Sequence, residues 1–534
     1  MQNELNSSKI VHSVGVVGGF TALSRGLGLV RDIFMAAFFG TSMHMSAFVV
    51  AFTIPNLFRR FFGEGALSSS FIPVFVESRK NEGDQRAWAF AQKITTFTTV
   101  TLSAIVFIGI VIITIVLATD LDEKTALTFS LLRIMLPYMV FICLVALAMG
   151  MLNSHHHFAT SAITPCVLNL FWISTILFIC PHVGSSMDLQ IRAVAWGILA
   201  AGIFQLGMQV PVLYRFGYRH RWSFDFKDQR VRQMLALMGP AAMGMAVTQI
   251  NVLIDRLLAA WIGDWAPAAL FYSERLVYLP LGLFTTAFST VLLPVFSRQV
   301  ISGKKEAFVQ TFSHGLRNLL FIMIPAAIGL FVLARPIVEM IFQGFEFTER
   351  SAELTAVALR FYAPGLVVFS LSKILVTAFY AQKDMCTPVK IGMITVGVNI
   401  VLNLLFIIIL PLPLKHAGIA FATVLAEAGY AMALCMIMVR RGFSPGWGSV
   451  GKTCIRCLTG AFLMGWLAVV LNKTLFDICL AQNMVWKMAQ IISVVGSIMM
   501  AILFYLFFSM LIRSADLKSI WVTIRPTKEI SKSN

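Results

Sequence analysis

The sequence predicts an all-helical membrane protein with fourteen transmembrane helices, and three observations lead to this fold class. The chain has 534 residues, of which 58% are hydrophobic and 13% charged, whereas soluble domains average about 25% charged residues. Apolar segments of the roughly 20 residues needed to cross a bilayer recur along the whole chain. Motifs of the first half return in the second half in the same order. A soluble fold is therefore excluded.

The first observation is the series of apolar segments, fourteen of which are long enough to cross a bilayer. The second and eighth are long for one crossing and contain prolines, so we expect bent or tilted helices there. These prolines are Pro55 and Pro73 in the second span, and Pro280 and Pro294 in the eighth. The fourteen segments are approximately residues 13–39, 44–75, 89–118, 126–152, 159–181, 190–214, 233–261, 267–297, 308–334, 353–381, 387–410, 415–439, 453–475 and 485–512.

The start of the chain and its cysteines add no further structural class. Residues 1–12 are polar and the apolar run that follows contains Arg25 and Arg31, so we expect no cleaved signal peptide. Most of the eight cysteines lie inside apolar segments. We therefore expect ordinary membrane-helix residues rather than a disulfide framework or a zinc site.

The positive charges predict the orientation. With the N-terminus inside, the cytoplasmic segments hold about 24 Lys and Arg residues against about seven on the other side, and short cytoplasmic loops are the ones that carry such an excess. The seven outer residues are Lys124, Arg192, Arg335, Arg350, Lys415, Lys473 and Lys487. Most of the formal net charge of +17 thus sets topology. Both termini are expected in the cytoplasm.

An internal repeat relates the two halves. The segment 66–75 returns as 287–296, Leu132 to Pro137 returns as Leu359 to Pro364, and 164–165 returns as 387–388, at offsets of 221, 227 and 223 residues. Each repeat holds six spans, an even number, so the halves share one orientation and an axis along the membrane normal. The predicted domains are residues 1–225, 226–441, 442–512 and the tail 513–534. Two such lobes with a site between them are typical of a transporter that alternates access.

Charged residues interrupt several apolar helices. Arg25 and Arg31 lie six residues apart on span one, roughly 9 Å along a helix axis. Span two carries Asn56, Arg59, Arg60 and Glu64, and span eight carries Glu274 and Arg275. A mid-membrane Arg costs about 2.5–3.5 kcal/mol even on the mildest scale. We therefore expect a cationic cavity that takes an anion such as a phosphate, with ion pairs such as Arg31–Asp32 or Arg60–Glu64 as the alternative.

A second polar set differs in kind. Asp255 lies in span seven, Asn399 and Asn403 are four residues apart in span eleven, and Thr423 lies in span twelve. Carboxylate and amide oxygens suit a hard cation, so we expect Na⁺ as a candidate ligand. The alternative is ordinary hydrogen bonding between membrane helices.

Other motifs carry little chemistry. His155, His156 and His157 follow span four, and one loop gives no metal geometry, so a solvated loop is expected. The chain has no Walker-type glycine loop and no paired-carboxylate or Ser/His/Asp arrangement in its outer loops. We expect a protein that is not an enzyme and that uses no ATP.

The residues resemble the MurJ (MviN) lipid II flippases of the MOP exporter superfamily over nearly the whole chain. The resemblance rests on the motifs at 24–32, 47–48, 55–60, 64–66, 272–276, 342–347, 379–384, 387–390 and 415–418. It implies fourteen helices in two six-helix lobes, with an extra pair at residues 442–512 that forms a groove for a lipid tail.

Carried over by position, the resemblance implies that four arginines line a central cavity and meet the diphosphate of an undecaprenyl-linked disaccharide-pentapeptide. These are Arg25, Arg31, Arg59 and Arg275, with Asn56, Arg60, Glu64 and Glu274 in support. It also implies a cation site at Asp255, Asn399, Asn403 and Thr423. Two positions depart from the family: Asn403 and Ser46 stand where an acid can occur, and the acid at position 46 is thought to help gate the outer side.

The function expected from these observations is a flippase of the bacterial inner membrane that moves lipid II to the outer leaflet for peptidoglycan synthesis. Its partners would be lipid II, membrane lipids and cell wall synthesis proteins, without nucleic acid, and its one candidate cofactor is Na⁺. The alternatives are a related exporter of another polyprenyl-diphosphate glycan or of a drug, and a non-transporting scaffold for envelope assembly. A drug exporter would favour acids and aromatics in its cavity.

Overall fold

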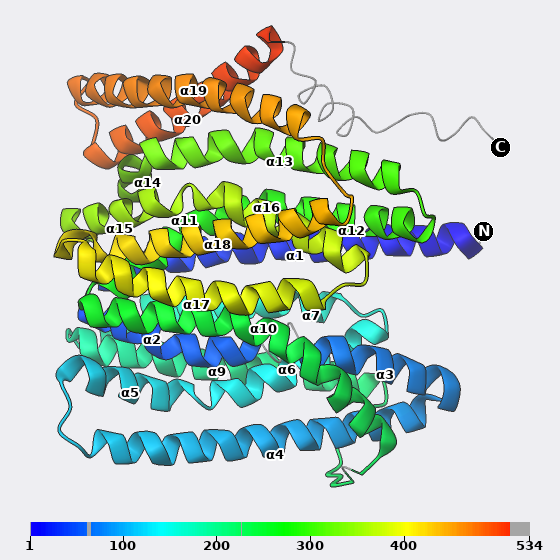
Figure 1. Cartoon of the computed structure of the whole chain (residues 1–534). Coiled ribbons are helices and arrows are strands. Elements are labelled where there is room, and N and C mark those ends of the chain that lie inside the picture. Colours follow the sequence, from blue (N-terminus) through cyan, green and yellow to red (C-terminus); the bar gives the residue numbers. More distant parts are fainter. Residues whose placement is uncertain (1, 61–65, 226, 513–534) are drawn as a thin grey trace. The chain divides into compact units, whose positions relative to one another are not determined.

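The computed structural model describes residues 2–60, 66–225 and 227–512, and nearly all of them are helical (Figure 1). No β-strand occurs in these ranges. Of the predicted functional residues, Glu64 lies outside the described residues, as does the tail 513–534.

The chain forms two compact units. Unit 1 comprises residues 1–268 with 345–347, and unit 2 comprises residues 269–344 and 348–534. The helices of unit 1 are α1 (Gln2–Phe39), α2 (Met43–Phe58), α3 (Ala66–Glu82), α4 (Asp84–Leu117), α5 (Glu123–Met135), α6 (Tyr138–Ser154), α7 (Ala159–Ser174), α8 (Cys180–Val183), α9 (Met187–Arg215) and α10 (Gln229–Ile262).

Unit 2 contains the remaining helices. They are α11 (Ala266–Pro280), whose first residues belong to unit 1, α12 (Thr286–Ile301), α13 (Lys305–Val332), α14 (Ala334–Phe342), α15 (Glu349–Tyr362), α16 (Gly365–Ala381), α17 (Cys386–Ile409), α18 (Lys415–Arg440), α19 (Trp447–Ala481) and α20 (Trp486–Leu511). Helix α10, which the repeat assigns to the second half, packs against α2 and α3 in unit 1. The boundary between the packing units thus lies after residue 268, whereas the repeat predicts a boundary after residue 225.

Eleven helices of the described chain are long and apolar enough to cross a membrane, or twelve if the bent pair α15 and α16 is one span. The shorter apolar helix α2 adds a further candidate, and α1 covers the first predicted span. The all-helical membrane fold is therefore confirmed, and fourteen spans are compatible with these helices.

Prolines mark several of the breaks in the spans. The fourth span breaks at Pro137 between α5 and α6, and the tenth bends by 44° where Pro364 separates α15 from α16. A π-helical turn, Leu281–Thr285, follows Pro280 in the eighth span, as expected from the ring's clash with the preceding turn. The second span is made of two helices, α2 and α3. Pro73 and Pro294 lie inside intact helices.

The sequence repeat reappears in the local structure of each unit. Pro137 precedes α6 with φ −62° and ψ −24°, and Pro364 precedes α16 with φ −59° and ψ −26°. In both repeats an Arg four residues earlier lies in the last turn of the preceding helix. The matching motifs therefore encode the same helix break twice.

Each unit has an aromatic core near one end of its bundle. In unit 1 the Phe71 ring stacks on Phe75 and Phe90, with centroids 5.3 and 5.6 Å apart, and Trp88 lies parallel to His155 at 4.9 Å. In unit 2 Phe296 and Phe308 meet at 4.9 Å. His155 is thus part of this core rather than of a solvated loop.

The extra helix pair packs on unit 2. Helices α19 and α20 contact each other, and α19 also contacts α13. A Cβ on Gly460 would lie 2.8 Å from the Phe508 ring, so glycine allows α20 to approach closely, as is common between membrane helices. The Tyr505 hydroxyl donates to the Phe321 carbonyl of α13 at 3.1 Å.

Candidate functional site

Helix α1 carries the first two predicted substrate arginines. Arg25 is exposed, whereas Arg31 is buried. Their separation of six residues makes roughly 9 Å along the helix, so the two guanidinium groups lie at different levels. The two residues therefore meet different surroundings.

Arg31 forms a buried ion pair. Its Nε and Nη2 donate to the same oxygen of Asp32 at 2.9 and 2.7 Å, and its Nη1 donates to the Asn169 side chain at 3.0 Å. The guanidinium also lies over the Trp172 ring at 4.4 Å. Since Asn169 and Trp172 belong to α7, this cluster fastens α1 to α7. The geometry favours the ion-pair alternative for Arg31.

Helix α2 carries the next set in unit 1. The Arg59 Nε donates to the Asn56 side chain at 3.0 Å, one turn away on the same helix. Arg59 and Arg60 are half-buried. The Asn56 amide thus orients the Arg59 guanidinium, whose planar group of donors suits an anionic ligand.

Helix α11 supplies the predicted residues of unit 2. The Tyr362 hydroxyl donates to the Glu274 carboxylate at 3.1 Å, and the Arg275 guanidinium lies over the Phe271 ring at 4.5 Å. Both charged residues are half-buried. Three of the four arginines thus belong to unit 1 and one to unit 2, so their convergence on one ligand stays a prediction.

The predicted cation ligands are likewise divided. Asp255 is buried on α10 in unit 1, where it accepts from the Asn251 amide at 3.4 Å. In unit 2 the buried Asn403 amide donates to Asn399 at 2.8 Å, and the Asn399 amide donates to Thr423 at 3.4 Å. The three residues of α17 and α18 therefore share one polar chain, and their meeting with Asp255 stays a prediction.

Ser46 occupies the position where the family resemblance expects an acid. Its side chain is buried on α2, and its hydroxyl accepts from the Ala268 backbone N–H at 3.3 Å. Ala268 lies in the first turn of α11, where unpaired N–H groups carry partial positive charge. A hydroxyl can cap this turn as an acid would, but it brings no charge.

The histidines and other ligand-type residues form no metal cluster in the part of the chain that the structure describes. The His155 Nδ1 donates to the Met151 carbonyl at 2.9 Å, and His157 contacts the Thr160 hydroxyl at 2.7 Å. Burial lowers the pKa of His155, and its contact with the Met151 carbonyl opposes that shift. The rings of His155 and His157 are therefore parts of the local packing, whereas His156 is exposed.

Asn169, Trp172 and Tyr362 contact predicted residues from another helix and were not expected from the sequence. Asn169 carried a usable signal, because an amide in the middle of an apolar span needs a polar partner. Trp172 and Tyr362 carried none, since aromatic residues are common in membrane helices and their partners lie far away in sequence.

Comparison with known proteins relates the chain to one transporter family. A family model described as lipid II flippase MurJ matches residues 35–512. The lipid II flippase MurJ of Burkholderia cenocepacia is 32% identical over 472 residues, covering 86% of this chain and 90% of the relative. A probable lipid II flippase MurJ of Vibrio cholerae is 35% identical over 413 residues, covering 75% and 78%.

Solved structures agree. A lipid II flippase MurJ in an inward closed conformation matches with a TM-score of 0.75 at 25% identity, covering 93% of this chain and 98% of that one. An inward-facing multidrug resistance MATE transporter of the MOP superfamily matches with a TM-score of 0.65 at 12% identity, covering 80% and 95%. The second match concerns the fold alone.

Proposed function

The chain belongs to the MurJ family of lipid II flippases, and from this premise we propose how its own residues carry the substrate. It is a multi-pass membrane protein that acts as a lipid II flippase, a transporter rather than a catalyst. We propose that the headgroup enters from the cytoplasmic side, that the lobes rock, and that the site then opens outward. No covalent step is needed, because translocation requires only different affinities in the two states.

The residues that would hold the headgroup are Arg25, Arg59 and Arg275, whereas Arg31 is engaged by Asp32 and Asn169. The observation that carries this proposal is the Arg59–Asn56 contact, which orients a guanidinium inside an apolar helix through a neutral amide. A planar guanidinium binds two oxygens of a phosphate at once. Glu274 and Tyr362 would orient Arg275 from its own unit.

The test is substitution of Arg25, Arg59 or Arg275 by Ala, followed by an assay of lipid II reaching an impermeant probe outside. We expect loss of translocation with normal membrane insertion. Arg350→Ala is the matched control, since Arg350 is an exposed arginine at the start of α15, away from these residues in sequence. Full transport by the three variants would refute the proposed headgroup site.

The coupling ion is a second proposal, resting on the polar chain of α17 and α18. Buried amide and hydroxyl oxygens together with the Asp255 carboxylate would take Na⁺ as ligands. We expect translocation that responds to a Na⁺ gradient in the wild type and no longer does so in Asp255→Asn. If the wild type ignores Na⁺ and follows the membrane potential, at about 2.3 kcal/mol per charge per 100 mV, the ion proposal fails.

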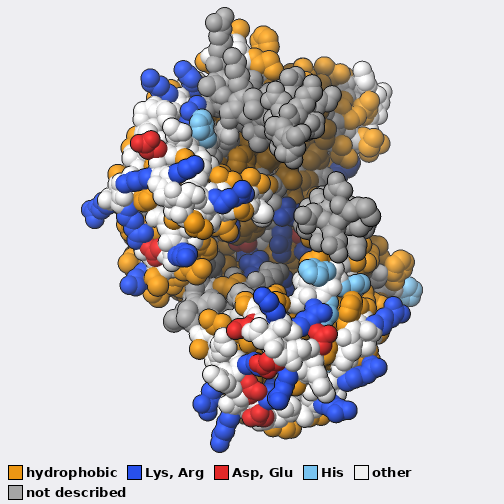
Figure 2. All heavy atoms as spheres, turned by 90° about the vertical axis from the view of Figure 1, so that its right-hand side faces the viewer, with side chains coloured by type: hydrophobic (Ala, Val, Ile, Leu, Met, Phe, Trp, Pro, Cys, Tyr) orange, Lys and Arg blue, Asp and Glu red, His pale blue; other side chains and the backbone are white. Residues whose placement is uncertain are grey.

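The location proposed is the bacterial cytoplasmic membrane, with both termini in the cytoplasm and with cell wall synthesis proteins as partners outside. Lys and Arg side chains are numerous on the face shown in Figure 2, which carries the end of α3 seen at the right of Figure 1. A basic face of this kind is typical of the cytoplasmic side. Reporter domains fused at each terminus test this: periplasmic activity at either end would contradict it.

A further inference from the structure

The segment between α9 and α10, residues 216–228, combines basic and aromatic side chains that the proposed transport cycle does not use. Arg219 and Arg221 are exposed. Trp222 and Phe224 are 59% and 64% exposed, and their rings lie nearly parallel with centroids 6.3 Å apart. Large apolar rings held in the open beside arginines indicate a surface that meets another phase or molecule.

Three hydrogen bonds fix this segment to α4. The Gln92 amide donates to the Arg219 carbonyl at 2.6 Å, and the Tyr218 hydroxyl donates to Thr95 at 3.1 Å. The Ser223 backbone N–H donates to the Thr96 hydroxyl at 3.2 Å. Because these bonds lie on both sides of Trp222, the aromatic pair has a defined position relative to α4.

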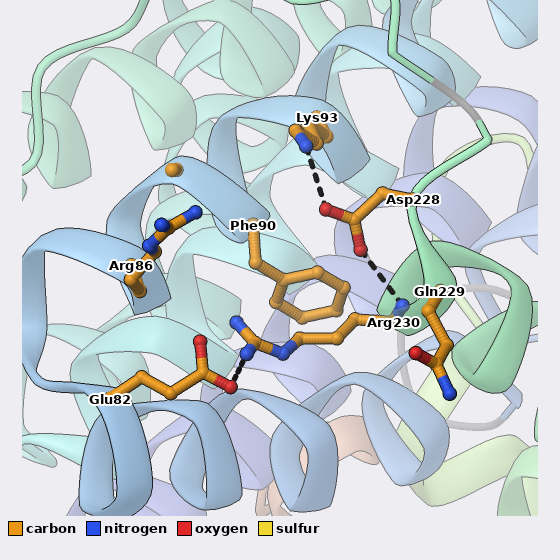
Figure 3. A pocket seen from close by; sticks show the side chains of 8 residues that line it. Glu82, Arg86, Phe90, Lys93, Asp228, Gln229 and Arg230 are labelled. Carbon is orange, nitrogen blue, oxygen red and sulfur yellow. Dashed lines mark hydrogen bonds and ion pairs between the residues drawn. The ribbon is translucent and has the colours of Figure 1, made fainter.

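Ion pairs engage the acids of the segment. Lys93 contacts Asp225 and Asp228, each at 2.7 Å. Figure 3 shows the adjoining pocket of about 250 Å³, where Arg230 faces Glu82 and Lys93 faces Asp228. Three cations and two acids line this pocket, which is a junction between α3, α4 and the start of α10. The carboxylates of Asp225 and Asp228 both contact Lys93, whereas Arg219 and Arg221 are exposed.

The height of the segment follows from the length of α4. Its exposed apolar side chains run from Val100 to Ile115, and α4 ends at Leu117. A hydrocarbon core about 30 Å thick takes about 20 residues at 1.5 Å each, which puts the other boundary near residue 97. Thr95 and Thr96 lie at that boundary, and about 20 Å of α4 extends beyond it. Trp222 and Phe224 therefore lie level with the headgroup region.

We propose that residues 216–225 bind anionic phospholipid headgroups of the leaflet on the cytoplasmic side, with Trp222 and Phe224 set into the interface and Arg219 and Arg221 on the phosphates. The proposal rests on the orientation proposed above. Trp is enriched at membrane interfaces because its ring is apolar with one polar edge. Arginines next to an anionic leaflet attract its phosphates. Charge complementarity therefore favours an anionic partner. The position of the segment at the level of the headgroups favours a lipid surface over a soluble acidic peptide.

The test uses the full chain in nanodiscs of phosphatidylcholine with increasing phosphatidylglycerol. Quenching by lipids brominated near the headgroup is measured as the difference between wild type and Trp222→Phe, since the chain has ten tryptophans. We expect clear quenching of Trp222, stronger with brominated phosphatidylglycerol. Arg219→Gln with Arg221→Gln should raise the phosphatidylglycerol content needed for half-maximal quenching roughly tenfold, since each cation near the surface counts severalfold.

The matched control is Arg298→Gln with Lys304→Gln, which should leave the dependence unchanged. Both residues are exposed cations, Arg298 in the last turn of α12 and Lys304 directly before α13. Equal quenching by both lipids, or an unchanged dependence in the Arg219/Arg221 variant, overturns the anionic site. No quenching of Trp222 overturns the interfacial position and leaves an aqueous protein partner as the alternative. These readouts do not involve translocation, so they stand whether or not the headgroup arginines prove essential for flipping.

Discussion

Asp32→Asn in α1 tests whether Arg31 serves the structure or the substrate. Arg31 and Asp32 are 9% and 3% exposed, and two guanidinium nitrogens share one carboxylate oxygen at 2.9 and 2.7 Å. The substitution keeps the shape of the side chain and removes its charge. Of the neighbours in the cluster, the Asn169 oxygen and the Trp172 ring then remain.

The magnitude follows from these contacts. Removing one partner of a buried ion pair costs about 3–5 kcal/mol, because the other charge stays buried. The new amide can still accept one hydrogen bond, which recovers about 1 kcal/mol. The cation over Trp172 contributes about 0.5–2 kcal/mol in either protein. We therefore expect a net loss of roughly 2–4 kcal/mol of stability.

The assay is thermal unfolding of the purified protein in detergent, read as an apparent midpoint because large membrane proteins unfold irreversibly. Arg31→Gln with Asp32→Asn removes both charges and should be less damaged than Asp32→Asn alone. The matched control is Asp188→Asn in the exposed pair with Arg192, whose side chains are 39% and 34% exposed. That loss should stay below about 1 kcal/mol.

Two results would refute the reasoning. If Asp32→Asn shifts the midpoint no more than Asp188→Asn does, the pair in α1 is not a buried structural contact. If the effects of Arg31→Gln and Asp32→Asn simply add, the two residues are not coupled. In either case Arg31 returns to the set of arginines that are open to substrate.

Two further predictions concern the turns. Gly40 has a φ of +52°, and Gly40→Ala would put a Cβ 2.2 Å from the Glu346 carbonyl oxygen. Gly303 has a φ of +65° and open space around it, so Gly303→Ala bears only the backbone strain of about 1–2 kcal/mol. Gly40→Ala should therefore lower the unfolding midpoint more than Gly303→Ala, and equal shifts would contradict the close contact. Asp384 is partly buried, which opposes ionisation, but hydrogen bonds from Thr387 and Arg441 outweigh this and lower its pKa to about 2. As pH falls, the unfolded chain therefore binds this proton before the folded protein does, so the stability that Asp384 adds is complete above about pH 4 and disappears toward pH 2. The difference in unfolding midpoint between wild type and Asp384→Asn should shrink over that range. A constant difference would contradict this prediction.

The helix breaks were only partly predictable, although their cause is local. Pro280 was expected to disturb the eighth span and is followed by a π-helical turn, whereas the breaks at Pro137 and Pro364 were not expected, even though each proline lacks the backbone N–H and restricts the residue before it. Pro73 and Pro294 have the same chemistry but lie inside intact helices. Whether a proline breaks or merely bends a helix depends on neighbours that re-satisfy the backbone, which sequence alone does not supply.

The candidate residues could be named from the sequence, but most of their partners could not. An arginine in an apolar run is visible at once, and its cost inside a membrane demands a partner. The neighbouring Asp32 was a visible partner for Arg31, whereas Asn169 was not, because it lies 138 positions away. The same holds for Glu274 and Tyr362, which are 88 positions apart. Residue type thus indicates where function lies, while tertiary packing decides which charges remain open to a ligand.

The internal repeat relates a charged pair in α1 to a charged pair in α10. Arg31 and Asp255 lie 224 residues apart, within the range of 221–227 set by the repeat motifs, and so do Asp32 and Arg256. All four are buried, but the order of acid and base is reversed. Because neighbouring helix positions differ by about 100°, equivalent faces of α1 and α10 present opposite charges. The same position of the repeat thus holds an arginine, Arg31, in the half that supplies most of the predicted phosphate ligands. In the half that supplies the predicted cation ligands it holds an acid, Asp255.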